Sequence, residues 1–319
     1  MNRPEIVMFG GAVVDIPICP IDPSVFTRNS TPVPRIQMNT GGDALNESMV
    51  LAALGDRVKL CSVVGDDAAG DFILRRCREA GIDTGAVTVD PTLDTSVNMV
   101  LVDPAGERYF VTSSSSSLRK FDLPHTAGVL ADLEGVKIAG FASIFVSPPF
   151  VPEKMAELFR QLKAAGVTLC ADMTRHKNGE LVADIACCLQ YIDYLFPNES
   201  EAEAVTGETD PEKMADALLA AGVKNVVIKT GSRGCLLKNP QMCVQVAGYP
   251  VETCVDTTGA GDTFAAGFIH GLNLGLSPIE CARFANACAS VCVERVGADA
   301  VVGQGELVRE RYAELGVRM

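Results

Sequence analysis

The sequence predicts an α/β fold in which helices flank a doubly wound, mostly parallel sheet. Helical patterns alternate with β-branched runs: residues 44–54 precede 58–64, residues 152–165 precede 167–171, and residues 210–221 precede 226–229. Glycines stand where helices should end, at Gly55, Gly81, Gly166 and Gly222. The alternation indicates parallel strands, because each helix returns the chain to the same end of the sheet.

Polar residues follow two predicted strands, residues 6–9 and 167–171, at their carboxyl ends. An apolar run at residues 6–9 ends at a glycine pair, and Asp15 comes soon after it. In open α/β sheets this edge holds ligands, so Asp15 is a candidate ligand-binding residue, with turn capping as the alternative. Asp172, Arg175 and His176 follow residues 167–171 at the same edge and are candidates for a role near substrate or phosphate.

Residues 96–102 and 108–112 are strand-like runs that interrupt the alternation. Residues 103–106 (Asp-Pro-Ala-Gly) between them have the chemistry of a hairpin turn. Residues 31–38 are expected to add another strand, and the serine run 113–117 is expected to be a flexible loop. The sequence thus predicts a small second sheet, which either has a structural role or covers the substrate.

The composition limits the partners and the compartment. A net charge of -13 and a pI near 4.7 disfavour nucleic acid and anionic membranes and leave a small polar substrate. There is no apolar run of about eighteen residues and no basic leader, so we expect a cytoplasmic protein. The twelve cysteines are expected to be reduced. Cys281, Cys288 and Cys292 have helical spacing and could share one face, which raises a metal or redox site as an alternative, but we expect them to be small buried side chains.

Residues 256–264 (Asp-Thr-Thr-Gly-Ala-Gly-Asp-Thr-Phe) combine a glycine turn, a helix start and a carboxylate. Gly259 and Gly261 permit positive φ, and a helix beginning near Asp262 presents N–H groups without intrahelical partners. Such a terminus binds phosphate, while Asp262 suits accepting a proton from a hydroxyl that attacks phosphorus. The segment therefore predicts phosphoryl transfer, with a simple N-cap as the alternative.

Two segments resemble signatures of the ribokinase-like (phosphofructokinase-B) carbohydrate kinases: residues 256–264 resemble the C-terminal one and residues 40–46 (Thr-Gly-Gly-Asp-Ala-Leu-Asn) the N-terminal one. The resemblance implies one ribokinase-like domain over residues 1–319, with a β lid formed by about 12–40 and 95–114. It also implies transfer of the γ-phosphoryl group of ATP to a hydroxyl of a sugar or sugar derivative. Asp262 would be the base, and the backbone of Gly259, Ala260 and Gly261 would form the anion hole with it.

The resemblance assigns the acceptor and the nucleotide to further residues. The residues that would bind the acceptor are Asp15, Gly41, Gly42 and Asn46. The carboxylate of Asp15 and the amide of Asn46 suit a polyol. The residues that would bind the nucleotide are Thr230, Gly231, Gly234, Asn286 and Asn198. Glu201, with Asn198, would organise Mg²⁺ through water. The same Asn-x-x-Glu spacing also suits a capping box, a purely structural alternative.

Some members of this family bind potassium or a similar ion beside the anion hole. The matching groups here are the Asp256 carboxylate, the Thr258 carbonyl and Gly297 in a later loop. Val301 stands where ribokinases often have a serine, so one ligand is missing from the pattern.

The sequence leaves the acceptor open. The strand expected at residues 144–146 lacks the glutamate that ribokinases use on their sugar. The aspartate after the glycine pair, Asp43, looks more like that of sugar-acid or other hexose kinases. The apolar residues Met99 and Val100 suit a nucleoside base, so a nucleoside kinase of the same family is an alternative, and a non-catalytic nucleotide or sugar sensor is a remote one. Unpaired strand groups at the edge of the lid favour a homodimer.

Overall fold

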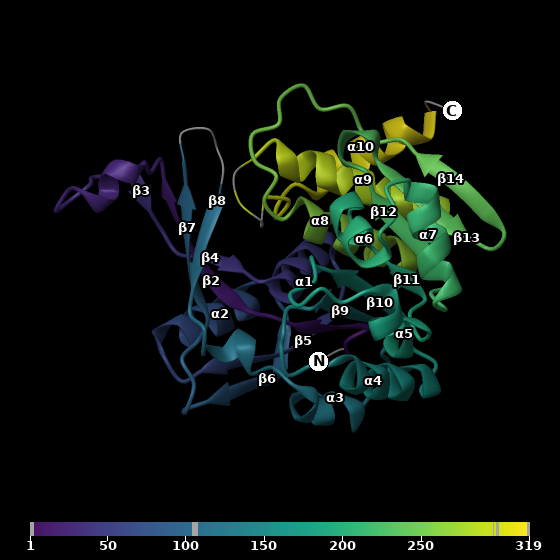
Figure 1. Ribbon diagram of the computed structural model, residues 1–319, viewed down its shortest axis with the longest axis horizontal. Helices are drawn as coiled ribbons and strands as arrows, with labels where there is room; N and C mark the ends of the chain where they lie inside the picture. Colours follow the sequence, from purple (N-terminus) through teal and green to yellow (C-terminus); the bar gives the residue numbers. More distant parts are fainter. Residues whose placement is uncertain (1–2, 104–107, 296, 298–299, 318–319) are drawn as a thin grey trace.

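The computed structural model describes residues 3–103, 108–295, 297 and 300–317 (Figure 1). Its larger sheet, sheet A, has parallel neighbours except for the antiparallel pairs β12–β13 and β13–β14. Its spatial order is β14 (Met242–Val246), β13 (Cys235–Asn239), β12 (Asn225–Lys229), β11 (Tyr194–Leu195), β10 (Thr168–Met173), β9 (Ile138–Ile144), β1 (Ile6–Gly10), β5 (Val58–Gly65) and β6 (Asp83–Asp90). The prediction of a doubly wound α/β fold is confirmed.

Two hydrophobic cores lie on opposite faces of sheet A. In β1, Ile6 and Met8 belong to one core and Val7 and Phe9 to the other, because successive side chains of a strand point to opposite faces. The first core packs against α1 (Asp43–Leu54), α2 (Ala68–Glu79), α8 (Ala260–Asn273), α9 (Pro278–Val293) and α10 (Gly305–Val317). The second packs against α3 (Ala127–Leu130), α4 (Pro152–Ala164), α5 (Val182–Leu189), α6 (Glu199–Thr206) and α7 (Pro211–Ala220).

A second sheet, sheet B, projects beside this body, at the left of Figure 1. Its order is β3 (Arg35–Ile36), β2 (Val13–Cys19), β7 (Val97–Val102) and β8 (Arg108–Thr112), and β4 (Asn39–Gly41) also pairs with β2. The antiparallel pairing of β7 with β8 agrees with the predicted hairpin, although residues 104–106 of the expected turn lie outside the described residues. The sequence had no signal for the parallel pairing of β2 with β7.

Three local predictions differ from the structure. The expected strand at 31–38 is reduced to the two residues of β3. The serine run 113–117 is not a flexible loop over its whole length. Its last two residues, Ser116 and Ser117, are buried, and their hydroxyls lie 2.8 and 3.3 Å from the Ser96 hydroxyl. The strand expected at 144–146 ends at Ile144, because Phe145 has a φ of 75° that leaves the extended conformation.

The expected helix ends agree with the structure. The four glycines predicted at helix ends all have positive φ. All twelve cysteines lie in the described part of the chain and are free thiols, with Cys281, Cys288 and Cys292 fully buried. None of the helices within the described ranges has the length and apolar character that a membrane span requires.

Candidate active site

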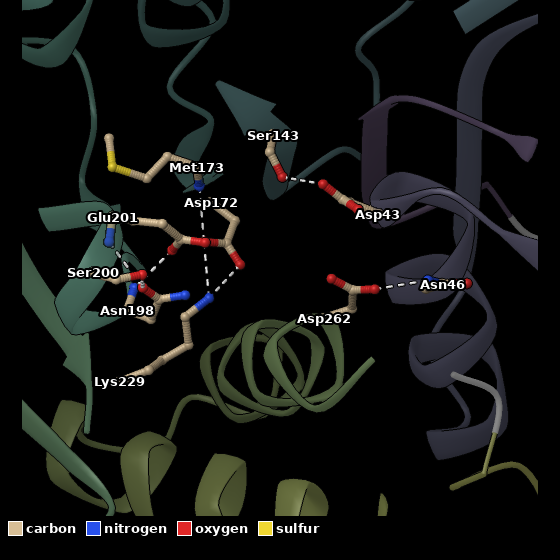
Figure 2. A network of polar contacts seen from close by, with 10 residues as sticks. All are labelled: Asp43, Asn46, Ser143, Asp172, Met173, Asn198, Ser200, Glu201, Lys229 and Asp262. Carbon is tan, nitrogen blue, oxygen red and sulfur yellow. Dashed lines mark hydrogen bonds and ion pairs between the residues drawn. The ribbon is translucent and has the colours of Figure 1, made fainter. Parts of the chain in front are cut away.

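A cavity of about 810 Å³ opens at the carboxyl ends of β9, β10 and β12, where it meets the start of α8. This is the edge at which an open α/β sheet holds ligands. The charged residues that line it come from five different segments of the chain: Asp43, Asp172, Glu201, Lys229 and Asp262. Figure 2 shows these side chains around one space, with Asp262 between the Lys229 group and α1.

The start of α8 carries the predicted anion hole. Gly259 is the N-cap residue, with φ 71° in the left-handed region and no side-chain cap. The helix begins at Ala260, two residues earlier than the sequence indicated. The Ala260 N–H donates to the Thr257 carbonyl at 3.2 Å, whereas those of Gly261 and Asp262 have no acceptor among the residues described. Two adjacent N–H groups are therefore available to an anion.

A glycine suits position 261 because a neighbouring side chain lies close to it, and not because its φ is positive. The residue lies in the first turn of α8, and a Cβ on it would stand 3.3 Å from the Lys229 ammonium nitrogen. Of the two glycines that permit positive φ, only Gly259 adopts it. The absence of a side chain lets an ammonium group approach the N-terminus of the helix.

Asp262 is held by the opposite end of the chain. Asn46 Nδ2 donates to Asp262 Oδ2 at 2.7 Å, which brings the two signature segments together. Burial raises the pKa of Asp262 well above its usual value, and the nearby Asp43 carboxylate raises it further, while the Asn46 hydrogen bond lowers it. A raised pKa makes the ionised carboxylate a stronger base. Asn46 Oδ1 is buried and accepts no hydrogen bond from the described residues.

A buried ion pair faces this carboxylate across the cavity. Lys229 Nζ lies 2.9 and 2.7 Å from the two oxygens of Asp172, which also accepts from the Met173 N–H (Figure 2). Burial alone would lower the pKa of Lys229, but the Asp172 and Glu201 carboxylates raise it above its ordinary value. Lys229 is therefore charged at neutral pH and lies next to the start of α8.

Asn198 and Glu201 form the capping box that the sequence also allowed. Asn198 Oδ1 accepts from the Glu201 N–H at 2.9 Å, and Glu201 Oε2 accepts from the Asn198 N–H at 2.8 Å. The same geometry places both side chains on the cavity wall. Burial raises the pKa of Glu201 to about 7, against a lowering by Lys229. Among the described residues, no three Asp, Glu, His or Cys side chains converge as a metal site.

The residues assigned to the nucleotide lie beyond this group. Gly231, Gly234 and Asn286 line the cavity, whereas Thr230 is buried and accepts from Gln245 at 3.3 Å. Asn286 Nδ2 donates to the carbonyls of Val246 and Ala247 at 3.3 and 3.1 Å, so part of its hydrogen-bonding capacity is structural.

The residues assigned to the acceptor lie at the junction of α1 and sheet B. Asp15 accepts from Asn98 Nδ2 at 2.8 Å, and burial raises its pKa. A Cβ on Gly41 would fall 2.2 Å from Asp15 Oδ2, so this glycine makes room for a carboxylate of the protein. Gly42 is the N-cap of α1 with φ 87°. Of these segments, Asp43 reaches the wall of the cavity and accepts from the Ser143 hydroxyl.

The structure adds residues that sequence reasoning missed. Lys229 ends a buried strand, and a charged residue in that position is a signal that was available. Asp172 joins the site, but Arg175 is exposed and His176 accepts from the Gly179 N–H; neither lines the cavity. Asp256, Thr258 and Gly297 lie together, as the resemblance implied, with Arg108 of sheet B in contact with Asp256. Val301 is buried in the core.

Comparisons with known proteins agree with this fold. A family model described as pfkB family carbohydrate kinase matches residues 4–302. The 2-dehydro-3-deoxygluconokinase of Bacillus subtilis (strain 168) is 30% identical over 270 residues, which cover 80% of this chain and 81% of that protein. The structure of Arabidopsis thaliana ribokinase complexed with ribose and ATP has a TM-score of 0.82 at 25% identity and covers 98% of this chain and 99% of that one. A putative ribokinase II from E. coli, solved with ATP and Mg²⁺, has a TM-score of 0.78 at 22% identity over 97% of this chain and 100% of that one, a likeness of fold.

Proposed function

The chain belongs to the pfkB family of carbohydrate kinases, and we propose that it transfers the γ-phosphoryl group of ATP to a hydroxyl of a sugar or sugar derivative. One observation carries the proposal. The Asp262 carboxylate, the free N–H groups of Gly261 and Asp262 and the Lys229 ammonium meet at one cavity. A proton acceptor, an anion hole and a cation are what in-line phosphoryl transfer needs from a protein.

Asp262 acts as the base in this proposal. The acceptor hydroxyl gives its proton to the Asp262 carboxylate as its oxygen attacks the γ-phosphorus, and ADP leaves with the bonding electrons of the bridging oxygen. The N–H groups at the start of α8 stabilise the charge on the transferred group, each worth about 3 to 4 kcal/mol in comparable anion holes. Lys229 adds a full positive charge on the same side, held by Asp172.

The nucleotide lies along Asn198, Gly231, Gly234 and Asn286 in this proposal, with Thr230 behind the loop. The support is that four of these five residues line the cavity that leads to Asp262. Because acidic side chains do not converge as a metal site within the described residues, Mg²⁺ would be held mainly by phosphate oxygens and water, with Glu201 acting through water.

The acceptor lies between α1 and sheet B. The buried Oδ1 of Asn46, which has no partner among the residues that the structure describes, supports a hydroxyl next to Asp262, and Asp15 offers a carboxylate at the junction. We assign to sheet B, within residues 12–40 and 95–114, the role of a lid that excludes water from the transferred group. Exposed Met99 and Phe110 on this sheet favour an apolar acceptor portion, so a nucleoside is the second candidate substrate.

A homodimer through sheet B is part of the proposal. Tyr109, Phe110 and Val111 of the edge strand β8 are each more than half exposed, and an unpaired apolar edge is a pairing surface. The free thiols fit a reducing compartment, which supports a cytoplasmic enzyme. Sedimentation of the wild type and of Phe110→Lys tests the dimer; a wild-type monomer at micromolar concentration would exclude it.

The deciding experiment measures Mg²⁺-dependent ADP release across pentoses, hexoses, sugar acids and nucleosides, with Asp262→Asn as the paired variant. We expect one class of acceptor to raise ADP release, and the variant to lose several orders of magnitude in turnover while it retains most of its ATP affinity. A sensor would show ATP or sugar binding unchanged in Asp262→Asn and no acceptor-dependent release in either protein.

A further inference from the structure

Arg108, the first residue of β8, contacts the carboxylate of Asp256 in the segment between β14 and α8. In Figure 1, β8 rises toward this segment, far from it in the sequence. The side chain of Asp256 is only 10% exposed and that of Arg108 24%. The contact joins sheet B to the segment that leads directly into the anion hole.

The other partners of Asp256 are also hydrogen-bond donors. Oδ1 accepts from the backbone N–H and the hydroxyl of Thr258 at 2.8 and 2.6 Å, and Oδ2 accepts from the Gly297 N–H at 3.0 Å. The Thr258 carbonyl in turn accepts from the Cys292 thiol at 3.4 Å. The oxygens that the resemblance assigned to a monovalent cation therefore already carry donors.

These residues do not fit a bound monovalent cation. A hard cation is held by oxygen lone pairs directed at it, whereas Gly297 offers Asp256 an N–H and Thr258 uses its N–H and hydroxyl on the same carboxylate. A guanidinium supplies the missing positive charge as a permanent part of the chain, and its planar N–H fork suits a carboxylate.

We infer that Arg108 is the built-in cation of this site: it takes the place of a monovalent ion at Asp256 and positions the anion-hole segment. The segment is fixed at its other side by the N–H groups of Val255 and Asp256, which donate to the Val293 carbonyl at 2.7 and 3.2 Å. Arg108 acts through Asp256, so it is a positioning residue. Because it belongs to sheet B, the same contact ties the anion hole to the position of that sheet.

The inference rests on the proposed function, and its test has two readouts. Wild type, Arg108→Ala and Arg108→Lys are compared in potassium chloride and in tetramethylammonium chloride at equal ionic strength. The first readout is the thermal unfolding temperature, which needs no substrate. The second is kcat with MgATP and the acceptor. Arg28→Ala is the control, because it removes an exposed arginine of the segment between β2 and β3, for which the described part of the chain shows no ion pair with Asp256.

We expect the wild type and Arg28→Ala to behave alike in the two salts. Arg108→Ala should lose about tenfold or more of kcat in tetramethylammonium, the effect of losing one charged hydrogen bond. Guanidinium at low concentration should restore part of that kcat, whereas potassium should restore neither the kcat nor the unfolding temperature of this variant, because Gly297 and Thr258 still direct an N–H and a hydroxyl at the Asp256 carboxylate. Arg108→Lys should lose less of its kcat than Arg108→Ala.

Two results would overturn the inference: potassium-specific activation or stabilisation of the wild type, or an Arg108→Ala variant with full kcat in tetramethylammonium. If Arg108→Ala does not fold, the wild type and Arg108→Lys still decide, because a built-in cation requires both to be indifferent to potassium. If no acceptor is phosphorylated by any variant, the proposed function fails, and the unfolding temperatures alone decide the inference.

Discussion

Asn46 donates a hydrogen bond of 2.7 Å to Asp262, from the first turns of α1 to the first turn of α8. The bond crosses 216 residues of sequence and fixes the carboxylate that we propose as the base. The other oxygen of the Asn46 amide is buried and unpaired within the described residues. One side chain thus positions Asp262 and carries the amide oxygen that we propose as the acceptor for a substrate hydroxyl.

We predict that Asn46→Ala lowers kcat/KM by about ten- to a hundredfold, because a hydrogen bond to a charged group is worth about 1.5 to 3 kcal/mol. Asn273→Ala is the matched control: Asn273 of α8 donates to Asp56 at 2.8 Å, the same kind of bond outside the cavity. Steady-state kinetics and urea unfolding of both variants check this. Equal losses of kcat/KM would show that the Asn46 effect is only structural.

The pH dependence should report the environment of Asp262. Burial and the Asp43 charge raise its pKa, and the base must be ionised, so kcat/KM should rise with pH through that raised pKa and then level off. Asp43→Asn removes one cause of the shift and should move the acidic limb to lower pH. Asp71→Asn, on the exposed face of α2, should leave it in place. An acidic limb that does not move in Asp43→Asn contradicts this assignment.

Lys229 and Lys238 form a pair for comparison on the neighbouring strands β12 and β13. Both side chains are mostly buried and ion-paired, Lys229 with Asp172 at 2.7 Å and Lys238 with Asp216 at 2.8 Å. We predict that Lys229→Met lowers kcat/KM for ATP by about a hundredfold or more, since it removes a charge from the anion site, whereas Lys238→Met changes it by about twofold at most.

Lys229→Met should also destabilise the fold by about 3 to 5 kcal/mol, because it leaves Asp172 buried without its partner. The double variant Lys229→Met, Asp172→Asn should recover much of that stability without recovering turnover. Urea unfolding beside the kinetics separates the two effects. A double variant that regains turnover would show that Lys229 has only a structural role.

The buried carboxyl group of Glu47 should make the free energy of unfolding depend on pH. It is 2% exposed on α1, its Oε1 has no partner among the described residues, and burial, with the nearby Asp172, Asp262 and Asp43, raises its pKa well above the ordinary 4.5. A carboxyl group whose pKa is raised by folding stabilises the protein below its unfolded pKa and loses that contribution as pH rises through the folded pKa.

Glu47→Gln removes this titration. The free energy of unfolding of the variant should therefore increase relative to that of the wild type between about pH 5 and about pH 8. Urea unfolding at both pH values measures the gain. Glu79→Gln, an exposed surface change, should show no such trend. A constant difference between Glu47→Gln and the wild type would mean that Glu47 does not titrate in this range.

Local order in the sequence determined the architecture and the place of the site. The alternation of helix and strand patterns predicted the parallel sheet, and residues 256–264 predicted the start of α8 and its carboxylate. Both are short-range signals: a glycine N-cap, a helix start and a strand end are each encoded within a few residues. That Asn198 would share a site with Asp262 was implied only by the resemblance to the kinase signatures.

Only the tertiary structure decided which charges meet. Lys229 with Asp172, Arg108 with Asp256 and the parallel pairing of β2 with β7 join segments that no local pattern connects. Burial raises the pKa of Asp262, Glu201 and Glu47, and burial depends on the packing of the whole chain. Charge pairing and desolvation act through space rather than along the sequence, so the chemistry of this site became readable only when the chain was folded.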